Sequence, residues 1–184
     1  MGVRTKTQAA SPAQADQADQ ADAEPRWLDE EQQLAWRAYM KMTRLMLEQL
    51  ERDLQRDAGM PLTYYEIMVR LSEAPDRTMR MSDLADRATS SRSSLSHAVA
   101  RLEDNGWVER RSCPEDRRGQ NAVLTDVGFA ALAAAAPIHV ESVHTNLIDA
   151  LTPTQLRQLR SISETLLDAF AAKGMTCPGE GGGR

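Results

Sequence analysis

The chain has 184 residues, of which 41% are apolar, and a formal net charge of −5 at pH 7. This length and apolar content favour one domain with a substantial core and exclude a chain that is disordered throughout. The acidic balance excludes a uniformly basic surface, so any nucleic-acid partner must be bound by a local basic patch.

Positive charge is concentrated in one segment of the chain. From Arg87 to Arg118 there are seven arginines and five acidic residues, which gives this segment a charge of +2 and leaves −7 for the rest. Four of these arginines, at positions 110, 111, 117 and 118, lie in or beside the turn-rich stretch "SCPEDRRGQ". This segment is therefore where a nucleic-acid partner is expected.

The two ends of the chain differ in composition from the middle. Residues 1–25 contain the repeat "AQADQADQAD", which has nothing to bury, and residues 174–184 end in "CPGEGGGR". We expect a disordered tail and a flexible tail there, with a single domain over residues 26–173. No apolar run of membrane-spanning length and no signal sequence is expected, and two widely separated cysteines fit a reducing, cytoplasmic setting.

Helical periodicity dominates the first half of the domain. Apolar residues recur every three or four positions from residue 27 to residue 57, and Gly59 and Pro61 end this helix. A second helix is predicted to begin at Thr63, with Glu66 completing a capping box, and to end before residue 75. A short third helix follows a cap at Ser82, and a fourth covers "SSRSSLSHAVARLEDNG".

The second half changes period after Gly106. The runs "WVERR" and "NAVLT" flank a turn-rich stretch and predict a β-hairpin with a long tip. An Ala-rich fifth helix begins at Thr125 and Asp126, and "LTPTQ" opens a sixth with a Thr152 cap and a Gln155 capping box. The fold class is therefore mainly α with a small β-hairpin wing, a winged helix-turn-helix.

The fourth helix is the predicted DNA-reading helix. Placed at 100° intervals, Leu95, Val99 and Leu102 share a core stripe, while the opposite face and its flanks are small, polar and nearly free of acid. Serines and a histidine near a helix N-terminus can approach phosphates and base edges. For Ser90 and Ser91 the alternative is a helix-capping role alone.

The stretch "RMSDLADRATSSRSSLSHAVARLEDNGWVERRSCPEDRRGQNAVLTDVG" resembles the DNA-binding core of the MarR family of bacterial transcriptional regulators, and the match extends from Trp27 to Ala172. Its most specific part is "DRRG" followed by "LTDVG". The resemblance implies that Arg118 enters a minor groove and that Asp116 holds the wing by pairing with Arg110.

Together with this resemblance, the helix pattern predicts a DNA-binding surface built from the fourth helix and the wing. The expected DNA-binding residues are Ser90, Ser91, Arg92, Ser93, Ser94, Ser96, His97, Arg101, Arg110, Asp116, Arg117 and Arg118.

The resemblance also implies a homodimer that binds double-stranded DNA at a palindromic operator, with repression as the default outcome. Apolar residues in the first and last helices exceed what a small winged domain needs, which supports dimerisation independently; they include Leu45, Met46, Leu50, Leu54, Leu156, Leu159, Ile162, Leu166, Leu167 and Phe170. A small aromatic or phenolic effector is implied, for which Trp36, Tyr39, Tyr64 and Tyr65 are candidate contacts, with ordinary core packing as the alternative.

Other classes of function have weaker support. No nucleophile elbow, phosphate loop or paired-carboxylate motif indicates an enzyme, and no cofactor is implied. His139 and His144 lie about 140° apart on a helix, unlike a shared metal pair, so no metal site is predicted. Cys113, between arginines, leaves open a redox-sensing repressor, and a protein-interaction module without DNA binding is the remaining alternative.

Overall fold

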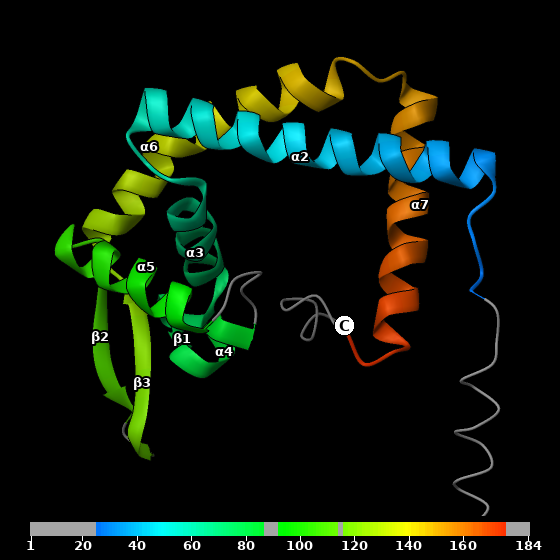
Figure 1. The fold of residues 1–184 in the computed structure, drawn as a ribbon. Helices are drawn as coiled ribbons and strands as arrows, with labels where there is room; N and C mark the ends of the chain where they lie inside the picture. The colour runs from blue at the N-terminus through cyan, green and yellow to red at the C-terminus, as the bar shows by residue number, and fades with distance from the viewer. Residues whose placement is uncertain (1–24, 87–91, 114–115, 176–184) are drawn as a thin grey trace, which may run out of the picture. The chain divides into compact units, whose positions relative to one another are not determined.

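The computed structural model describes residues 25–86, 92–113 and 116–175, and the side chains at positions 86, 92 and 116–118 lie outside that description. Expectations for the two tails therefore lie outside the described residues. The chain forms two compact units, residues 1–41 and residues 42–184. The long helix α2 (Glu30–Ala58) begins in the first unit and ends in the second, and all other helices and strands belong to the second (Figure 1).

Helix α2 ends at Ala58 and is followed by Gly59, whose φ of +61° is readily adopted by glycine. Helix α3 (Leu62–Glu73) begins one residue before the predicted cap, and the capping box at Thr63 is wrong. The amide of Leu62 instead donates to the Glu51 carboxylate of α2 at 2.8 Å, so a long-range contact satisfies the first turn.

Helices α4 (Met81–Asp86) and α5 (Arg92–Asp104) occupy the predicted positions of the helix-turn-helix pair. Helix α4 begins at Met81, so Ser82 lies inside its first turn and the predicted Ser82 cap is wrong. The Ser82 hydroxyl lies 3.1 Å from the Asp83 carboxylate rather than capping the helix. Helix α5 is followed by Gly106, with a φ of +70°, which turns the chain into the wing.

The wing is an antiparallel pair, β2 (Val108–Cys113) and β3 (Asp116–Leu124), as predicted, but the predicted long tip is wrong because the strands continue to Cys113 and from Asp116. A third strand, β1 (Thr78–Arg80), pairs with the other edge of β3 to give the order β1-β3-β2 and was not predicted. A three-residue strand carries too little alternation to be distinguished by pattern. Within the described residues, the winged helix-turn-helix arrangement is confirmed (Figure 1).

The C-terminal helices follow the wing. Helix α6 (Asp126–Val143) runs through Pro137 and continues into a π-helical segment, η2 (His144–Ile148). Helix α7 (Pro153–Ala171) begins with the predicted capping box, because the Thr152 hydroxyl accepts from the Gln155 amide and the Gln155 side chain accepts from the Thr152 amide.

The core of the second unit joins α2, α3, α4, α5, the sheet and α6. Its largest fully buried side chains are Leu54, Met60, Met68, Leu71, Leu84, Leu95, Leu102, Val99 and Val108. Leu50 and Leu54 of α2 belong to this core, so they are not surplus apolar residues left for dimerisation. The prediction that Leu50 and Leu54 are surplus residues is therefore wrong, because the C-terminal half of α2 packs into the winged domain.

Helix α7, unlike the helices of the core, has no buried residue along its length in a single chain. Its exposed large apolar side chains are Leu156, Ile162, Leu166, Leu167 and Phe170. Leu45 of α2 is also exposed. An apolar surface of this kind is typical of a face that another protein surface covers.

One described helix is long and apolar enough to span a membrane by length and composition alone. It covers Asp126–Ile148, 23 residues with a mean hydropathy of 1.2 over its most apolar window. The expectation that no run reaches this length is therefore wrong. Leu132 and Ala135 of this helix lie in the core of the winged domain, and a single helix of this type is weak support for a membrane span.

Candidate nucleic-acid interface

Helix α5 presents the polar face that the sequence predicted. Leu95, Val99 and Leu102 are 0–1% exposed and fix the rotation of the helix against the core. Exposed on the other side are Ser93, Ser94, Ser96, His97 and Arg101. Arg101 carries an ion pair with Asp104 at 3.3 Å, and its side chain is 73% exposed. This surface is small and polar, and it contains no acidic residue before Glu103.

The base of the wing is closed by Thr125, the residue that follows β3. Its hydroxyl donates to the Gly106 carbonyl at 2.7 Å and accepts from the Gly128 amide at 2.9 Å, which caps α6. Its own amide donates to the Trp107 carbonyl at 3.0 Å. One threonine therefore joins the turn after α5, the end of the wing and the start of α6.

Gly128 is required by this closure. A Cβ atom at position 128 would lie 2.0 Å from the Trp107 carbonyl oxygen and 2.9 Å from a Leu124 methyl group. The first of these is a backbone atom and cannot rotate away. The "LTDVG" motif thus has a physical basis, because the threonine caps the helix while the glycine lets the helix approach the wing.

Arg110 of β2 is bound to α5. Its amide donates to Glu103 Oε1 at 3.0 Å, its Nε lies 3.3 Å from Glu103 Oε2, and its Nη2 donates to the Ser96 carbonyl at 3.0 Å. Figure 1 shows β2 and α5 as neighbours. The expected partner, Asp116, has a side chain outside the described residues, so that pairing stays a prediction.

Several expected DNA contacts fall outside the description. Ser90 and Ser91 lie outside the described residues, and the same holds for the side chains of Arg92, Asp116, Arg117 and Arg118. The backbone from Asp116 onward is part of β3, opposite β2. Arg111 of the wing pairs with Glu109 of the same strand.

Cys113 lies at the end of β2, where the register with β3 shifts. Its side chain is buried, with the residue 7% exposed, and its Sγ accepts from the Arg80 guanidinium at 3.3 Å. A reactive thiol needs both a nearby cation and access to the oxidant. In this structure the Arg80 guanidinium is the nearby cation, and burial of Cys113 restricts the access of an oxidant to its thiol.

The four aromatic residues considered for an effector lie on two helices. Trp36 and Tyr39 are exposed on the first half of α2, with ring centroids 6.4 Å apart. Tyr64 is half-buried on α3, and Tyr65 is buried with its ring 4.6 Å from that of His139. Desolvation lowers the pKa of His139 and raises that of Tyr65. Tyr65 therefore belongs to the core.

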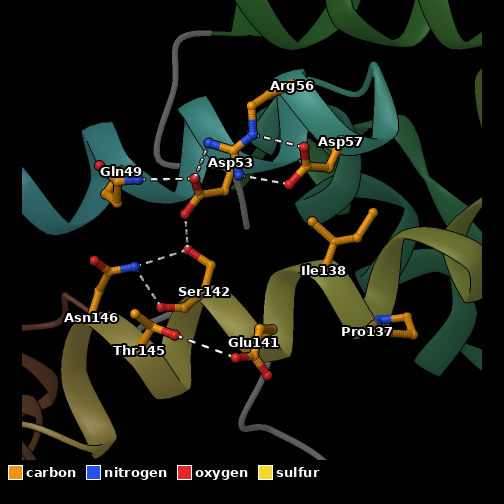
Figure 2. A pocket seen from close by; sticks show the side chains of 10 residues that line it. All are labelled: Gln49, Asp53, Arg56, Asp57, Pro137, Ile138, Glu141, Ser142, Thr145 and Asn146. Carbon is orange, nitrogen blue, oxygen red and sulfur yellow. Dashed lines mark hydrogen bonds and ion pairs between the residues drawn. The ribbon is translucent and has the colours of Figure 1, made fainter.

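An open pocket of about 600 Å³, lined mainly by polar residues, lies between the second half of α2 and the α6–η2 region. It is lined by Gln49, Asp53, Arg56, Asp57, Pro137, Ile138, Glu141, Ser142, Thr145 and Asn146 (Figure 2). None of these residues was singled out from the sequence, because the pocket depends on how α2 meets α6.

Asp53 is the centre of this pocket's wall, as Figure 2 shows. The Ser142 hydroxyl donates to Asp53 Oδ2 at 2.6 Å, Gln49 donates to Oδ1 at 2.9 Å, and Arg56 lies 3.1 Å from Oδ1. These contacts, the Ser142 hydrogen bond foremost, lower the pKa of Asp53 against the opposing effect of burial. The buried carboxylate thus crosslinks α2 and α6 in its ionised form.

Among the described residues, no group of three or more histidine, cysteine, aspartate or glutamate side chains is placed to hold a metal ion. His139 stacks on Tyr65, and His144 lies 3.7 Å from the Asp149 carboxylate. The two histidines therefore have separate partners.

Comparisons with known proteins agree with this architecture. The sequence model of the MarR family matches residues 60–119. The transcriptional repressor MprA of Escherichia coli K12 is 30% identical over 134 residues, which cover 73% of this chain and 75% of MprA.

Solved structures are also similar. The Streptomyces coelicolor MarR family regulator Sco3205, crystallised in complex with DNA, is 48% identical, with a TM-score of 0.77, and the match covers 85% of this chain and 98% of Sco3205. AbsC from the same organism is 41% identical, with a TM-score of 0.73 and coverage of 80% and 99%. With its winged helix-turn-helix, its "LTDVG" closure and these relatives, the chain belongs to the MarR family of transcriptional regulators.

Proposed function

We propose that this protein is a cytoplasmic, sequence-specific DNA-binding repressor that acts as a homodimer on a palindromic operator. The observation that carries the proposal is the exposed polar face of α5 beside a wing fixed at its base by Thr125. The relatives support it, since Sco3205 was crystallised with DNA and MprA is a transcriptional repressor.

In this proposal α5 enters the major groove. Ser93, Ser94, Ser96 and His97 contact base edges and phosphates, and Arg101 contacts a phosphate. Ser90, Ser91 and Arg92 complete this surface at the N-terminal end of the helix, which favours an anion. The exposed apolar face of α7 supports a homodimer, because dimerisation would remove this surface from water.

The wing supplies the second contact. Arg118 would enter a minor groove, since a guanidinium is always charged and loses its hydration more readily than an ammonium. Arg117 would contact phosphate, and Asp116 would hold the wing. Loss of Arg118 should therefore reduce discrimination between sequences, whereas loss of Arg117 should reduce affinity for all sequences, because minor-groove contacts discriminate between sequences and phosphate contacts do not.

The test compares Arg118→Ala with Arg117→Ala in binding titrations on an operator duplex and a scrambled duplex across a salt series. Arg118→Ala should weaken operator binding by about 1 to 3 kcal/mol per wing and reduce discrimination. Arg117→Ala should weaken both duplexes alike and reduce the salt slope by about one per lost contact. A folded Arg118→Ala dimer with wild-type affinity and discrimination would contradict the role of the wing.

The proposal includes release of the DNA by a small aromatic or phenolic molecule. The exposed Trp36 and Tyr39 are the proposed contacts, whereas Tyr64 packs against the core and Tyr65 lies within it. A panel of aromatic acids in an operator-release assay tests this part, and retention of the complex at saturating concentrations of every compound would contradict it.

A further inference from the structure

Glu103 and Arg110 make a closely coupled contact beside the proposed DNA surface. Glu103 lies in the last turn of α5, and Arg110 lies in the wing strand β2. The Glu103 carboxylate contacts two groups of Arg110, since one oxygen accepts from the backbone amide at 3.0 Å and the other lies 3.3 Å from Nε. A single carboxylate therefore contacts both the backbone and the side chain of one wing residue, through a hydrogen bond to the amide and an ion pair with the guanidinium.

The guanidinium makes a second contact farther along the same helix. Its Nη2 donates to the Ser96 carbonyl at 3.0 Å. Ser96 and Glu103 are seven residues apart, which corresponds to about 10 Å along an α-helix. One guanidinium therefore contacts groups from two different turns of α5, which fixes the orientation of the Arg110 side chain against the helix.

The exposure of the side chains supports a role inside the protein. The Arg110 side chain is 25% exposed and that of Glu103 is 30% exposed, whereas Arg101 on the same helix is 73% exposed. Arg110 is also paired with Ala122 of β3 in the sheet register, so its position is transmitted to both wing strands. Arg110 is therefore bound mainly by α5 and the sheet rather than directed into solvent.

We infer that Glu103 and Arg110 are positioning residues, which lock the wing to α5 so that both elements meet the DNA in one fixed geometry. The inference rests on the proposed function and assigns Arg110 a role different from a direct DNA contact. A fixed geometry of α5 and the wing favours binding to the operator sequence, because the entropy lost in ordering the two elements is already lost in the free protein.

A positioning role of Glu103 can be distinguished from the general effect of its negative charge on DNA binding. Loss of the Glu103 carboxylate makes the DNA-facing side less negative, so charge alone predicts tighter binding. A positioning role predicts weaker binding to the matching duplex instead. The two explanations therefore give opposite signs for Glu103→Gln.

The experiment uses the full chain and a duplex that the wild-type protein enriches from a random library, with a scrambled duplex for comparison. The variants are Glu103→Gln, Arg110→Gln and the double variant, and the matched control is Arg101→Gln on the exposed face. Each is titrated across a salt series below its melting temperature, which is measured in parallel.

We expect each single variant to lose about tenfold in affinity for the enriched duplex, with the double variant no worse than either, because contacting residues are not additive. The salt slope should stay at the wild-type value, and the affinity of Glu103→Gln for scrambled duplex should not fall, because charge alone favours this variant. Arg101→Gln should instead lower the salt slope by about one and weaken both duplexes. Glu103→Asp and Arg110→Lys, which keep their charges, should lose several-fold and serve if a glutamine variant unfolds.

Three results would overturn the inference. Tighter or unchanged binding of Glu103→Gln to the enriched duplex would exclude a positioning role. A salt slope that Arg110→Gln lowers and Glu103→Gln leaves unchanged would also exclude it, since that pattern identifies Arg110 as a phosphate contact. Additive losses in the double variant would show independent roles. If the wild-type protein enriches no duplex at all, the proposed function itself is wrong and this inference falls with it.

Discussion

Replacement of Gly128 by alanine tests whether the closure at the base of the wing stabilises the fold. The added methyl group would lie 2.0 Å from the Trp107 carbonyl oxygen, well inside any permitted contact. Either α6 or the turn at Trp107 must move, and movement of α6 stretches the 2.9 Å hydrogen bond from the Gly128 amide to Thr125 Oγ1.

The size of the effect follows from three contributions. Overpacking against a site that cannot yield costs about 1 to 3 kcal/mol. Loss of the Thr125 cap costs about 1 kcal/mol more, while the better helix propensity of alanine returns at most about 1 kcal/mol. We therefore expect Gly128→Ala to lower the free energy of unfolding by about 1 to 3 kcal/mol, or the melting temperature by about 2 to 12 °C for a chain of this size.

Thermal melts at one fixed protein concentration measure this, because dimerisation makes the melting temperature depend on concentration. Gly59→Ala is the matched control, since its Cβ would meet nothing within 4 Å and only its φ of +61° is unfavourable. It should cost about 1 kcal/mol. A Gly128→Ala variant as stable as the wild type would refute the steric argument, because it would show that helix propensity outweighs the contact.

Three further predictions concern stability and oxidation. The Ser142 hydrogen bond lowers the pKa of Asp53 below its ordinary 3.8, so ionised Asp53 stabilises the fold above that pH, and this contribution is lost as the pH falls through the folded pKa. In urea unfolding, Ser142→Ala should therefore lower the free energy of unfolding by about 1 to 2 kcal/mol at pH 7 and by less at pH 3. An equal loss at both pH values would contradict this prediction. Leu95→Ala should lower the free energy of unfolding by about 2 to 5 kcal/mol, whereas Ser96→Ala on the exposed face should change it by no more than about 0.5 kcal/mol. Similar losses in a denaturant titration would mean that the assignment of the buried and exposed faces of α5 is wrong. Peroxide should leave operator binding intact because Cys113 is buried, and peroxide-induced release that Cys113→Ser abolishes would identify a redox sensor.

Periodicity and local signals predicted much of this fold. The rotation of α5 followed from the spacing of Leu95, Val99 and Leu102, and the start of α7 followed from Thr152 and Gln155, because both depend on residues within a few positions of one another.

Features that depend on distant residues were not predicted. The first turn of α3 is satisfied by Glu51, eleven residues before Leu62, and no local pattern indicates that partner. The Asp53–Ser142 bond joins residues 89 positions apart. Glu103 is close to Arg110 in sequence, yet their contact requires the turn at Gly106 to bring β2 against α5.

The short strand β1 determines how the wing can bend. Its last pair with β3 joins Arg80 to Asn121, so β3 is held on both edges from Asn121 to Val123 and by β2 alone beyond that point, toward Gln120. The inner part of β3 is therefore clamped between two strands, whereas a force applied to β3 beyond Asn121 is resisted by its hydrogen bonds to β2 alone.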